Sequence, residues 1–594
     1  MSSRNITKLF RSWQVRSLRT LYKLDTPREF YLIFLAIIVG TLTGYGAYVL
    51  TLIVNGVHFL LFEQADMKLF SDETANYLRI IYPALGGITV GLLAYFFSPE
   101  VKGHGVPSVI DAVANKGGFI RKRIAFLTSI NSGTTIGSGG SAGKEGPIVQ
   151  IGAALGSIVG QLFHVSQQRM RVLVGCGAAS GLAAVFNAPV AGVVFAVEII
   201  LSDFRLSVFT PIMISSVIAT AISRHYIGSS PLFSIPAYSL QSPTEYIFYL
   251  IMGVVGGVVS VIFIKTLYGI EDFFEEGISL PPWVKPAIGG LLTGAIAYYF
   301  PELYGFDDSA THTALVGHPE IYLLAILVVA KILATSFTLG SGGTGGLFTP
   351  SLFIGATFGA LFGNIVGQLF PSIAAPPGAY ALVGMGVIVA GTIHAPLTAL
   401  LIIFEVTGDY KIILPLMLGT VTATLIAKWL ETESIYTMKI SQFSNRTDNG
   451  RNVDILQSHR INNLIQTDVP VIRAHTGFEE ILNILMNSSL VTFPVLDDKD
   501  KLIGIISLRD LRPVLFNRDL APLLVAADVM SENVFVLNPN DTMGDALHKM
   551  ELDDSELLPV VDSPETMHFL GIVTRESILK RYTKENLLLA DQRE

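Results

Sequence analysis

Residues 137–153 read GSGGSAGKEGPIVQIGA, with a lysine and a glutamate side by side among glycines. Glycines, a lysine and a following helix are also the ingredients of a phosphate-binding loop. That loop needs a glycine five residues before its Gly-Lys pair and a Ser or Thr directly after the lysine. Here Ser138 holds the first position and Glu145 the second, so the stretch must have another purpose.

A second copy of this stretch, GSGGTGGLFTPSLFIGA, occupies residues 340–356. The glycines, the proline and the final Ile-Gly-Ala match at a constant offset of 203 residues. Two further matches follow at an offset of 207, GSIVGQLF with GNIVGQLF and NAPVAGVVFAVEI (187–199) with HAPLTALLIIFEV (394–406). The sequence therefore predicts two homologous halves, joined near 230–245.

Composition places most of the chain in a lipid bilayer. Hydrophobic residues make up 51% of the 594 residues, only 15% are charged, and the mean hydropathy is +0.54. A soluble chain is more evenly balanced. Some apolar segments match the length that spans a bilayer core, and shorter ones with Gly or Pro indicate helices that end inside the membrane. The segments are 31–54, 79–97, 186–201, 208–224, 245–265, 284–300, 320–338, 376–393, 396–407 and 411–430.

The N-terminus is basic and is expected in the cytoplasm by the positive-inside rule. The first 28 residues carry seven Lys or Arg and no compact apolar region that ends in small residues, which does not fit a cleavable signal. The net charge of −8 belongs largely to the polar C-terminal region. The single cysteine, Cys176, excludes an intrachain disulfide, and we expect it to pack in an apolar run.

Internal repeats in a polytopic membrane protein are typical of transport folds, whose substrate sites lie at the repeat interface between the ends of broken helices. In both copies the glycine-rich stretch precedes a proline and an apolar helix. A helix N-terminus presents unpaired N–H groups and the positive end of its dipole, so two such ends would converge on an anion. A small anion held in this way can also leave again, as conduction requires.

Glu145 stands at the mouth of this predicted anion site. A carboxylate there is attracted by the same N–H groups and would compete with the anion, as a tethered gate that moves with protonation or voltage. The alternative is an ion pair with the adjacent Lys144, which is disfavoured because neighbouring residues point to different faces of a helix. We therefore predict that Glu145 is a gate.

The chain changes near residue 440 to the polar stretch SQFSNRTDNGRNVDILQSHRINNL, as expected of a linker. Beyond it, TFPVLDDKDKLIGIISLRDL (492–511) is echoed by LLPVVDSPETMHFLGIVTRESIL (557–579). Pro494 and Pro559 are each predicted to open a short strand, followed by a turn, a second strand and the start of a helix. This soluble α/β region resembles two tandem cystathionine-β-synthase (CBS) modules, which in that family usually associate into one disc.

In the CBS family a hydroxyl followed three residues later by an Asp often holds a nucleotide ribose. Ser507 and Asp510 fit this pattern in the first copy. The second copy has Thr574, but Ser577 stands in the Asp position and Glu576 lies one residue early. An adenine nucleotide at the CBS pair is therefore one interpretation, and a dimerisation and anchoring domain is the other. No cofactor is required.

The membrane region resembles the CLC family of chloride channels and proton/chloride exchangers over nearly its whole length. GKEGP (143–147) matches the family's G(K/R)EGP, whose glutamate is the gate and external proton acceptor. The resemblance therefore gives that role to Glu145 and places Lys144 and Gly146 beside the anion.

Two further motifs carry the resemblance. GLFTP (346–350) matches GxFxP, which implies that the amides of Leu347 and Phe348 face the central anion. KGHGVP matches GSGIP, whose serine hydroxyl helps to coordinate the anion from inside. In this chain His104 replaces that serine and is followed by Gly105.

The histidine is the first departure from the family pattern. An imidazole can donate N–H to an anion, but it is larger than serine and titrates near neutral pH. His104 would narrow the inner gate, alter the preference between nitrate and chloride, or turn aside as a packing residue. The tyrosine that closes the inner mouth in the family is expected at Tyr436, within ESIYTMKI.

The second departure bears on proton coupling. Exchangers of the family typically carry two successive glutamates here, of which the second relays protons from the inside. In this chain Glu198 takes the first place and Ile199, which cannot carry a proton, takes the second. An apolar residue there favours a passive, voltage- or pH-gated chloride channel, and a proton-coupled antiporter that uses water or His104 is the alternative. Glu198 also fits a structural role at a helix end, as does Glu405 at the matching position.

The resemblance implies an α-helical polytopic membrane protein with two inverted repeats of the CLC type and a cytoplasmic α/β tandem CBS domain. It also implies a homodimer with a separate pore in each subunit, in the plasma (inner) membrane, with both termini cytoplasmic. Chloride, nitrate and protons are the expected partners besides lipid, and nucleic acid is not. The predicted parts are a basic N-terminus 1–29, the transmembrane domain 30–440 with repeats at about 30–228 and 244–440, a linker 441–464, and CBS modules at 465–526 and 527–586.

Two other classes fit the sequence poorly. Tandem CBS modules also occur on magnesium channels, but a cation path would need converging carboxylates, and the repeated motif offers amides and a single glutamate. An intramembrane enzyme would need a nucleophile with a base, or metal ligands at helical spacing such as H-E-x-x-H, and none of the 11 histidines stands in that pattern.

Overall fold

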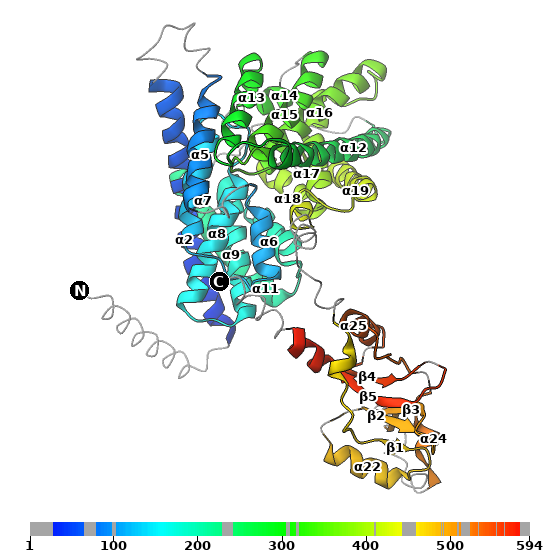
Figure 1. Cartoon of the computed structure of the whole chain (residues 1–594). Helices are drawn as coiled ribbons and strands as arrows, with labels where there is room; N and C mark the ends of the chain where they lie inside the picture. The colour runs from blue at the N-terminus through cyan, green and yellow to red at the C-terminus, as the bar shows by residue number, and fades with distance from the viewer. Residues whose placement is uncertain are drawn as a thin grey trace, which may run out of the picture. The chain divides into compact units, whose positions relative to one another are not determined.

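The computed structural model divides the chain into two compact units, residues 1–441 and 442–594 (Figure 1). Most of the predicted N-terminal segment and linker lies outside the described residues. The structure describes residues 28–64, 79–97, 103–228, 242–304, 309–316, 320–408, 411–441, 459–488, 490, 492–507, 510–511, 523–532, 534–553, 555–563 and 565–582.

The first unit is helical throughout its described residues, and the helices of its second half (green to yellow) lie beside those of its first half (blue to cyan) in Figure 1. The first half contains α2 (Arg28–His58), η1 (Phe59–Gln64), α5 (Tyr82–Phe97), α6 (Val106–Ala114), α7 (Arg123–Gly137), α8 (Glu145–Leu162), α9 (Gln167–Phe186), α10 (Pro189–Phe195), η3 (Ala196–Leu201) and α11 (Leu206–Tyr226). The second contains α12 (Glu245–Asp272), η4 (Phe273–Gly277), α13 (Lys285–Tyr299), η5 (Pro301–Leu303), α14 (Ser309–Val316), α15 (Ile321–Gly340), α16 (Phe348–Leu369), α17 (Pro377–Ile393), α18 (Pro396–Thr407) and α19 (Ile413–Leu430).

Seven helices among the described residues are long and apolar enough to cross a membrane. Two of them, α9 and α16, fall outside the apolar segments identified from the sequence, although an apolar helix was predicted after the second glycine-rich stretch, where α16 begins. The α9 helix opens with Gln-Gln-Arg-Met-Arg and continues with many Gly and Ala residues, whose small side chains give a weak hydropathy signal. Its most apolar window is 83% buried within the protein, so it meets other helices more than lipid and tolerates this composition. The shorter apolar helices include α5, α17 and α18, as expected of helices that end inside a membrane.

The two halves meet at positions that correspond in the repeat. Helices α5 and α13 cross where Gly87 lies against Pro286 and Gly290 lies against Pro83. A Cβ atom on either glycine would come within 2.2 Å of the opposite proline's carbonyl oxygen, so the crossing needs glycine on both helices. Gly87 and Gly290 are 203 residues apart, as are Pro83 and Pro286. The crossing therefore repeats the offset of the glycine-rich stretches and extends the internal repeat upstream.

The joints from α9 to α10 and from α17 to α18 are also built alike. Asn187 and His394 end α9 and α17 in the left-handed conformation, each with φ of 57°. The next helices begin with Pro189 and Pro396, whose fixed φ suits a first helical turn and whose missing N–H costs nothing there. Each joint therefore stops one helix and starts another within three residues, which produces the broken helices expected of this fold.

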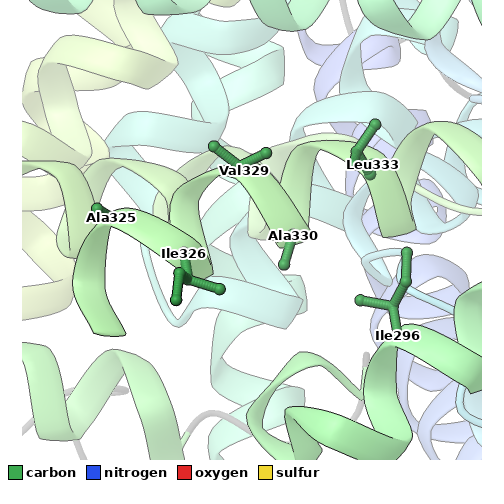
Figure 2. A pocket seen from close by; sticks show the side chains of 6 residues that line it. All are labelled: Ile296, Ala325, Ile326, Val329, Ala330 and Leu333. Carbon is green, nitrogen blue, oxygen red and sulfur yellow. The ribbon is translucent and has the colours of Figure 1, made fainter. Parts of the chain in front are cut away.

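An apolar groove of about 430 Å³ lies between α13 and α15 (Figure 2). Aliphatic side chains line it, and almost none of its lining surface is polar. The lining residues are Ile296, Ala325, Ile326, Val329, Ala330 and Leu333. Both helices belong to the apolar unit, so the groove is a surface suited to lipid chains rather than to a charged substrate.

The second unit is α/β. It contains η6 (Ile461–Leu464), β1 (Ile472–Arg473), α22 (Phe478–Asn487), β2 (Thr492–Leu496), β3 (Leu502–Ser507), α24 (Ala526–Val529), α25 (Met543–Leu552), β4 (Leu557–Val561) and β5 (Phe569–Thr574). Strand β2 pairs antiparallel with β3 and parallel with β1, and β4 pairs antiparallel with β5. Pro494 and Pro559 lie in the third position of their strands, two residues inside the strand starts expected from the sequence.

The two hairpins of this unit join at their turns. Leu502 N donates to Met567 O at 2.8 Å, and Phe569 N donates to Asp500 O at 3.1 Å. Close by, Leu502 packs with Leu496 and Val561 in a small apolar cluster shared by both hairpins. The sequence echo therefore corresponds to two like modules that join through their hairpin turns within one unit.

Candidate functional site

The two glycine-rich loops pair with each other in the interior of the membrane unit. Gly143 and Gly346 exchange both backbone hydrogen bonds, at 2.9 and 2.7 Å. Two matched hydrogen bonds from a loop amide to a threonine of the other half flank this pair: Ser141 N to Thr338 Oγ1 at 3.1 Å and Thr344 N to Thr135 Oγ1 at 3.3 Å. Each partner stands 203 residues from its counterpart, and α8 and α16 begin at equivalent positions directly after the pair.

The Glu145 side chain reaches from the start of α8 to the N-terminus of α16. Its Oε1 accepts hydrogen bonds from Phe348 N at 2.6 Å and Thr349 N at 3.0 Å, and its Oε2 accepts one from Thr349 Oγ1 at 2.8 Å. These amides are among those that a helix leaves unpaired at its N-terminus, where the helix dipole also favours a negative charge. Glu145 is only 2% exposed. The start of α16 is therefore a buried site built to bind an anionic group.

The paired glycines form a slot around this carboxylate. A Cβ atom on Gly143 would lie 2.0 Å from Glu145 Oε2, and one on Gly346 would lie 2.3 Å from Oε1. Any larger residue at either position would exclude the carboxylate from the slot. The glycines of the repeat therefore have a direct purpose at this site, which is to let a charged group approach the backbone closely.

The residues predicted around Glu145 lie close to it. Lys144 and Leu347 are the N-cap residues of α8 and α16, and Phe348 donates its amide to the Glu145 carboxylate. Both oxygens of the Glu145 carboxylate accept hydrogen bonds from α16, so the carboxylate does not depend on an ion pair with Lys144. Gly146 packs against the loop before α6, where its Cβ atom would lie 2.4 Å from His104 O.

Thr349 was not among the predicted site residues. It occupies the variable position of GxFxP, which gave no reason to assign it a role, yet its hydroxyl is the one side-chain donor to Glu145 within the described residues. The feature that could have identified Thr349 from the sequence is its hydroxyl, a hydrogen-bond donor next to the predicted anion-binding amides. A donor one residue inside a helix N-terminus can face the same ligand as the free amides.

His104 and Tyr436, the two predicted inner residues, are both buried, at 3% and 2% exposure. The Tyr268 ring stands edge-on to the His104 ring, with centroids 6.3 Å apart, and Tyr268 Oη donates to Ile435 O at 2.5 Å. Tyr436 in turn interacts electrostatically with Glu145. Gly105, the N-cap residue of α6, adopts φ of 77° and turns the chain at this point.

Glu198 and Glu405 cap each other's helices. Glu198 Oε2 accepts hydrogen bonds from Thr398 N at 2.8 Å and Thr398 Oγ1 at 2.6 Å, at the start of α18. Glu405 accepts bonds from the amides at the start of α10, Val190 N at 3.0 Å and Ala191 N at 2.7 Å. The reciprocal arrangement fits the structural role foreseen for a carboxylate at a helix end. The neighbouring Ile199 is partly buried and packs against the main apolar core.

Comparison with known proteins gives the family. Residues 86–428, more than half of the chain, match the family described as "Voltage gated chloride channel". The chain belongs to the CLC family. Residues 461–517 and 525–584 each match the CBS domain. The resemblance drawn from GKEGP, GLFTP and the repeated C-terminal modules is thereby confirmed, and so is the membrane fold with two inverted repeats.

The relatives of this CLC chain include proteins named as chloride channels and proteins named as exchangers. It is 34% identical over 390 residues to a "Putative chloride channel protein ClcB-like" of Ralstonia nicotianae, covering 65% of this chain and 90% of that one. It is 30% identical over 586 residues to "Chloride channel protein CLC-f" of Arabidopsis thaliana (84% and 73% covered). It is 32% identical over 436 residues to "H(+)/Cl(-) exchange transporter ClcA" of Vibrio campbellii (71% and 91% covered).

Solved structures also resemble this CLC chain, and two of them illustrate the likeness. A slow cyanobacterial Cl⁻/H⁺ antiporter gives a TM-score of 0.65 at 27% identity, covering 71% of this chain and 99% of that one. A eukaryotic CLC transporter gives a TM-score of 0.62 at 19% identity, covering 92% of this chain and 97% of that one. The second likeness supports the fold alone, and its coverage extends into the C-terminal unit.

The predicted nucleotide residues differ between the two CBS modules. Asp510 Oδ2 accepts hydrogen bonds from both Ser507 N and Ser507 Oγ at 2.7 Å. In the second module Ser577 N donates to Thr574 Oγ1 at 3.2 Å, while Glu576 forms an exposed ion pair with Lys580. A hydroxyl with a carboxylate, the combination suited to a ribose, is therefore present in the first module and absent at the matching position of the second.

The described residues contain no group of three or more His, Cys, Asp or Glu that could hold a metal ion. Cys176 is buried and unpaired with another cysteine, in the apolar cluster that joins α2, α9 and α11.

Proposed function

We propose that this protein exchanges chloride for protons across a membrane and that Glu145 is both its gate and its outer proton acceptor. The main support is the position of the Glu145 carboxylate on the amides of Phe348 and Thr349. An ionised carboxylate and a chloride ion need the same donors, so each excludes the other from the start of α16. Protonation removes the carboxylate's charge and gives chloride the advantage, which links anion entry to proton uptake.

Comparison with relatives supports exchange over the passive channel that Ile199 favoured. The ClcA relatives are named as H⁺/Cl⁻ exchange transporters, and the solved structure at 27% identity is described as a Cl⁻/H⁺ antiporter. Passive conduction stays as the second candidate because of one observation, the isoleucine at the position where an inner glutamate would relay protons. Two relatives are also named as chloride channel proteins.

The test is ion flux from liposomes that contain the purified full-length protein, with valinomycin to set the voltage and a pH electrode in the bath. A chloride gradient should drive protons uphill, and Glu145→Gln should abolish that proton movement because its amide cannot take up a proton. Glu198→Gln is the matched control, since it makes the same change on a capping carboxylate. Rapid chloride efflux without any linked proton movement would instead establish the passive channel.

Several further properties belong to this proposal. We expect a homodimer in the plasma (inner) membrane, with both termini cytoplasmic and with nitrate also accepted, as the family resemblance implies. For the CBS pair, the residues fit a nucleotide ribose in the first module through Ser507 and Asp510. The second module lacks the matching carboxylate beside Thr574. A single adenine nucleotide, held from the first module, is the form of binding that these residues support.

A further inference from the structure

The His104 imidazole is a buried titratable group without a hydrogen-bond partner. It is 3% exposed, and neither ring nitrogen bonds to any of the residues that the structure describes. A buried polar group normally has a partner, and an exception calls for an explanation such as an ion or a transported ligand. A neutral imidazole has one N–H and one bare nitrogen, so it can accept a proton on one side and release another from the other side.

Lys439, which acts electrostatically on this imidazole, forms an ion pair with Glu271. Glu271 is in the last turn of α12, and its side chain is 10% exposed, while Lys439 comes from the segment after α19 and is 17% exposed. One oxygen of Glu271, Oε2, is buried and has no hydrogen-bond partner among the described residues. Lys439 acts electrostatically on His104, and Tyr268, one turn before Glu271, stands edge-on to the imidazole.

We propose that Glu271 and His104 form the inner proton route of this protein, in place of the carboxylate that Ile199 lacks. The inference rests on the proposed exchange of chloride for protons. The groups that face the imidazole are Tyr268 from α12 and Lys439 from the C-terminal segment, and its own loop packs on the start of α8 next to Glu145. Glu271 is the carboxylate bound to that Lys439, and we assign it the uptake of a proton from the inner side.

The proposed route moves one proton from inner water to Glu145, and it needs no reactant besides water. A proton from inner water forms an O–H bond at Glu271 Oε2, while Lys439 stays bound to the other oxygen. That O–H bond breaks and the proton passes through water, as an N–H bond forms on the bare nitrogen of His104. The opposite N–H of the imidazolium then breaks and its proton passes through water to the Glu145 carboxylate, which restores a neutral imidazole. Exchange in the opposite direction reverses these steps.

The ion pair also explains how the route is coupled to chloride. The Lys439 ammonium repels a second positive charge on the nearby imidazole, so the imidazolium is unfavourable in an empty site. A chloride ion beside His104 offsets that repulsion, and its effect is strong because the surroundings are buried and poor in water. His104 therefore carries a proton readily only when an anion is present, which ties each proton step to an anion.

The experiment compares the ratio of proton to chloride flux in liposomes for the full-length protein and single variants. His104→Gln keeps a polar side chain of similar size, and Glu271→Gln keeps an acceptor for Lys439. Each should lower proton flux more than chloride efflux, so that the ratio of proton to chloride flux falls by at least about tenfold, since a positioned proton carrier is typically worth 10²-fold or more. His164→Gln, on an exposed loop residue, is the matched control and should leave the ratio unchanged.

The outcomes separate this route from the exchange function itself. A wild-type protein that moves chloride without protons refutes the exchange function and this route with it. Exchange by the wild type with an unchanged flux ratio in His104→Gln refutes the route alone. An equal loss of chloride and proton flux also refutes it, because a residue that only packs or only binds the anion would give that result. His104→Ser, which restores the family's residue, provides the same measurement if the glutamine variant does not fold.

Discussion

Removal of the Thr349 hydroxyl should weaken the hold of α16 on the Glu145 carboxylate, the proposed gate, by a predictable amount. The Glu145 carboxylate is held at the start of α16 by two amides and this one hydroxyl, which bonds to Oε2 at 2.8 Å. A hydrogen bond to a charged group contributes about 1.5–3 kcal/mol, which corresponds to a factor of about 10–150. In Thr349→Ala the two amides remain, so the carboxylate should compete with chloride less well by about this factor.

The assay is the initial rate of chloride efflux as a function of chloride concentration. Because the gate and the anion need the same amides, a weaker gate should lower the chloride concentration at half-maximal rate in Thr349→Ala, by at least about tenfold at the low end of the estimate above. Thr349→Ser keeps the hydroxyl and should behave as the wild type. In Glu145→Ala there is no carboxylate to hold, so the added Thr349→Ala change should have no effect.

Two results would refute this reasoning. If Thr349→Ala leaves the half-maximal chloride concentration unchanged, the hydroxyl does not hold the gate. If the same shift persists without the Glu145 carboxylate, the hydroxyl acts on the anion directly. The double substitution therefore separates a contact with the gate from a contact with the substrate, because coupling between two residues appears only when both are present.

Three further predictions concern stability and the C-terminal unit. Glu405→Ala removes the acceptor for two amides at the start of α10, so thermal unfolding in detergent should show a loss of about 1–2 kcal/mol with an unchanged flux ratio. Asp510→Ala removes the acceptor of both Ser507 hydrogen bonds, so calorimetry should show weakened binding of any adenine nucleotide; unchanged binding would place the nucleotide elsewhere. Hydrogen bonds from Thr542 and Thr566 lower the pKa values of Asp545 and Asp562, so their stabilisation is complete above the unfolded value near pH 4 and is lost as the pH falls below it; unfolding followed by circular dichroism should show this loss.

The paired loops and the role of Glu145 could be predicted from the sequence because the repeat contains glycines that no larger residue can replace. The pairing of Gly143 with Gly346 leaves no room for a side chain, so both glycines stand at the same place in each half. A lone glutamate beside such a loop is conspicuous in an apolar chain, and its position at a helix start indicated the anion chemistry. Local sequence patterns were sufficient to predict this part of the site because each glycine-rich loop is followed directly by its helix in the chain.

Other parts of the site could not be predicted because they depend on contacts between distant segments. Glu271 and Lys439 are 168 residues apart, and each alone reads as a charged residue near the end of a helix. Thr349 acquires its role only because Glu145 crosses to α16 instead of remaining on its own helix. The α9 span was missed for a related reason, since a helix that packs mainly on protein needs less hydropathy than one that faces lipid.

The internal repeat explains why a single carboxylate can act as a gate. Glu145 and Phe348 occupy equivalent first positions of α8 and α16, and only the first of them carries a charge. A glutamate in the first turn can interact favourably with its own helix end, but Glu145 bonds instead to the other half. In the proposed exchange, chloride would replace the carboxylate as one negative charge for another on the same donors, so the total charge at the start of α16 would not change. The same replacement would break the link between the two halves that the carboxylate provides.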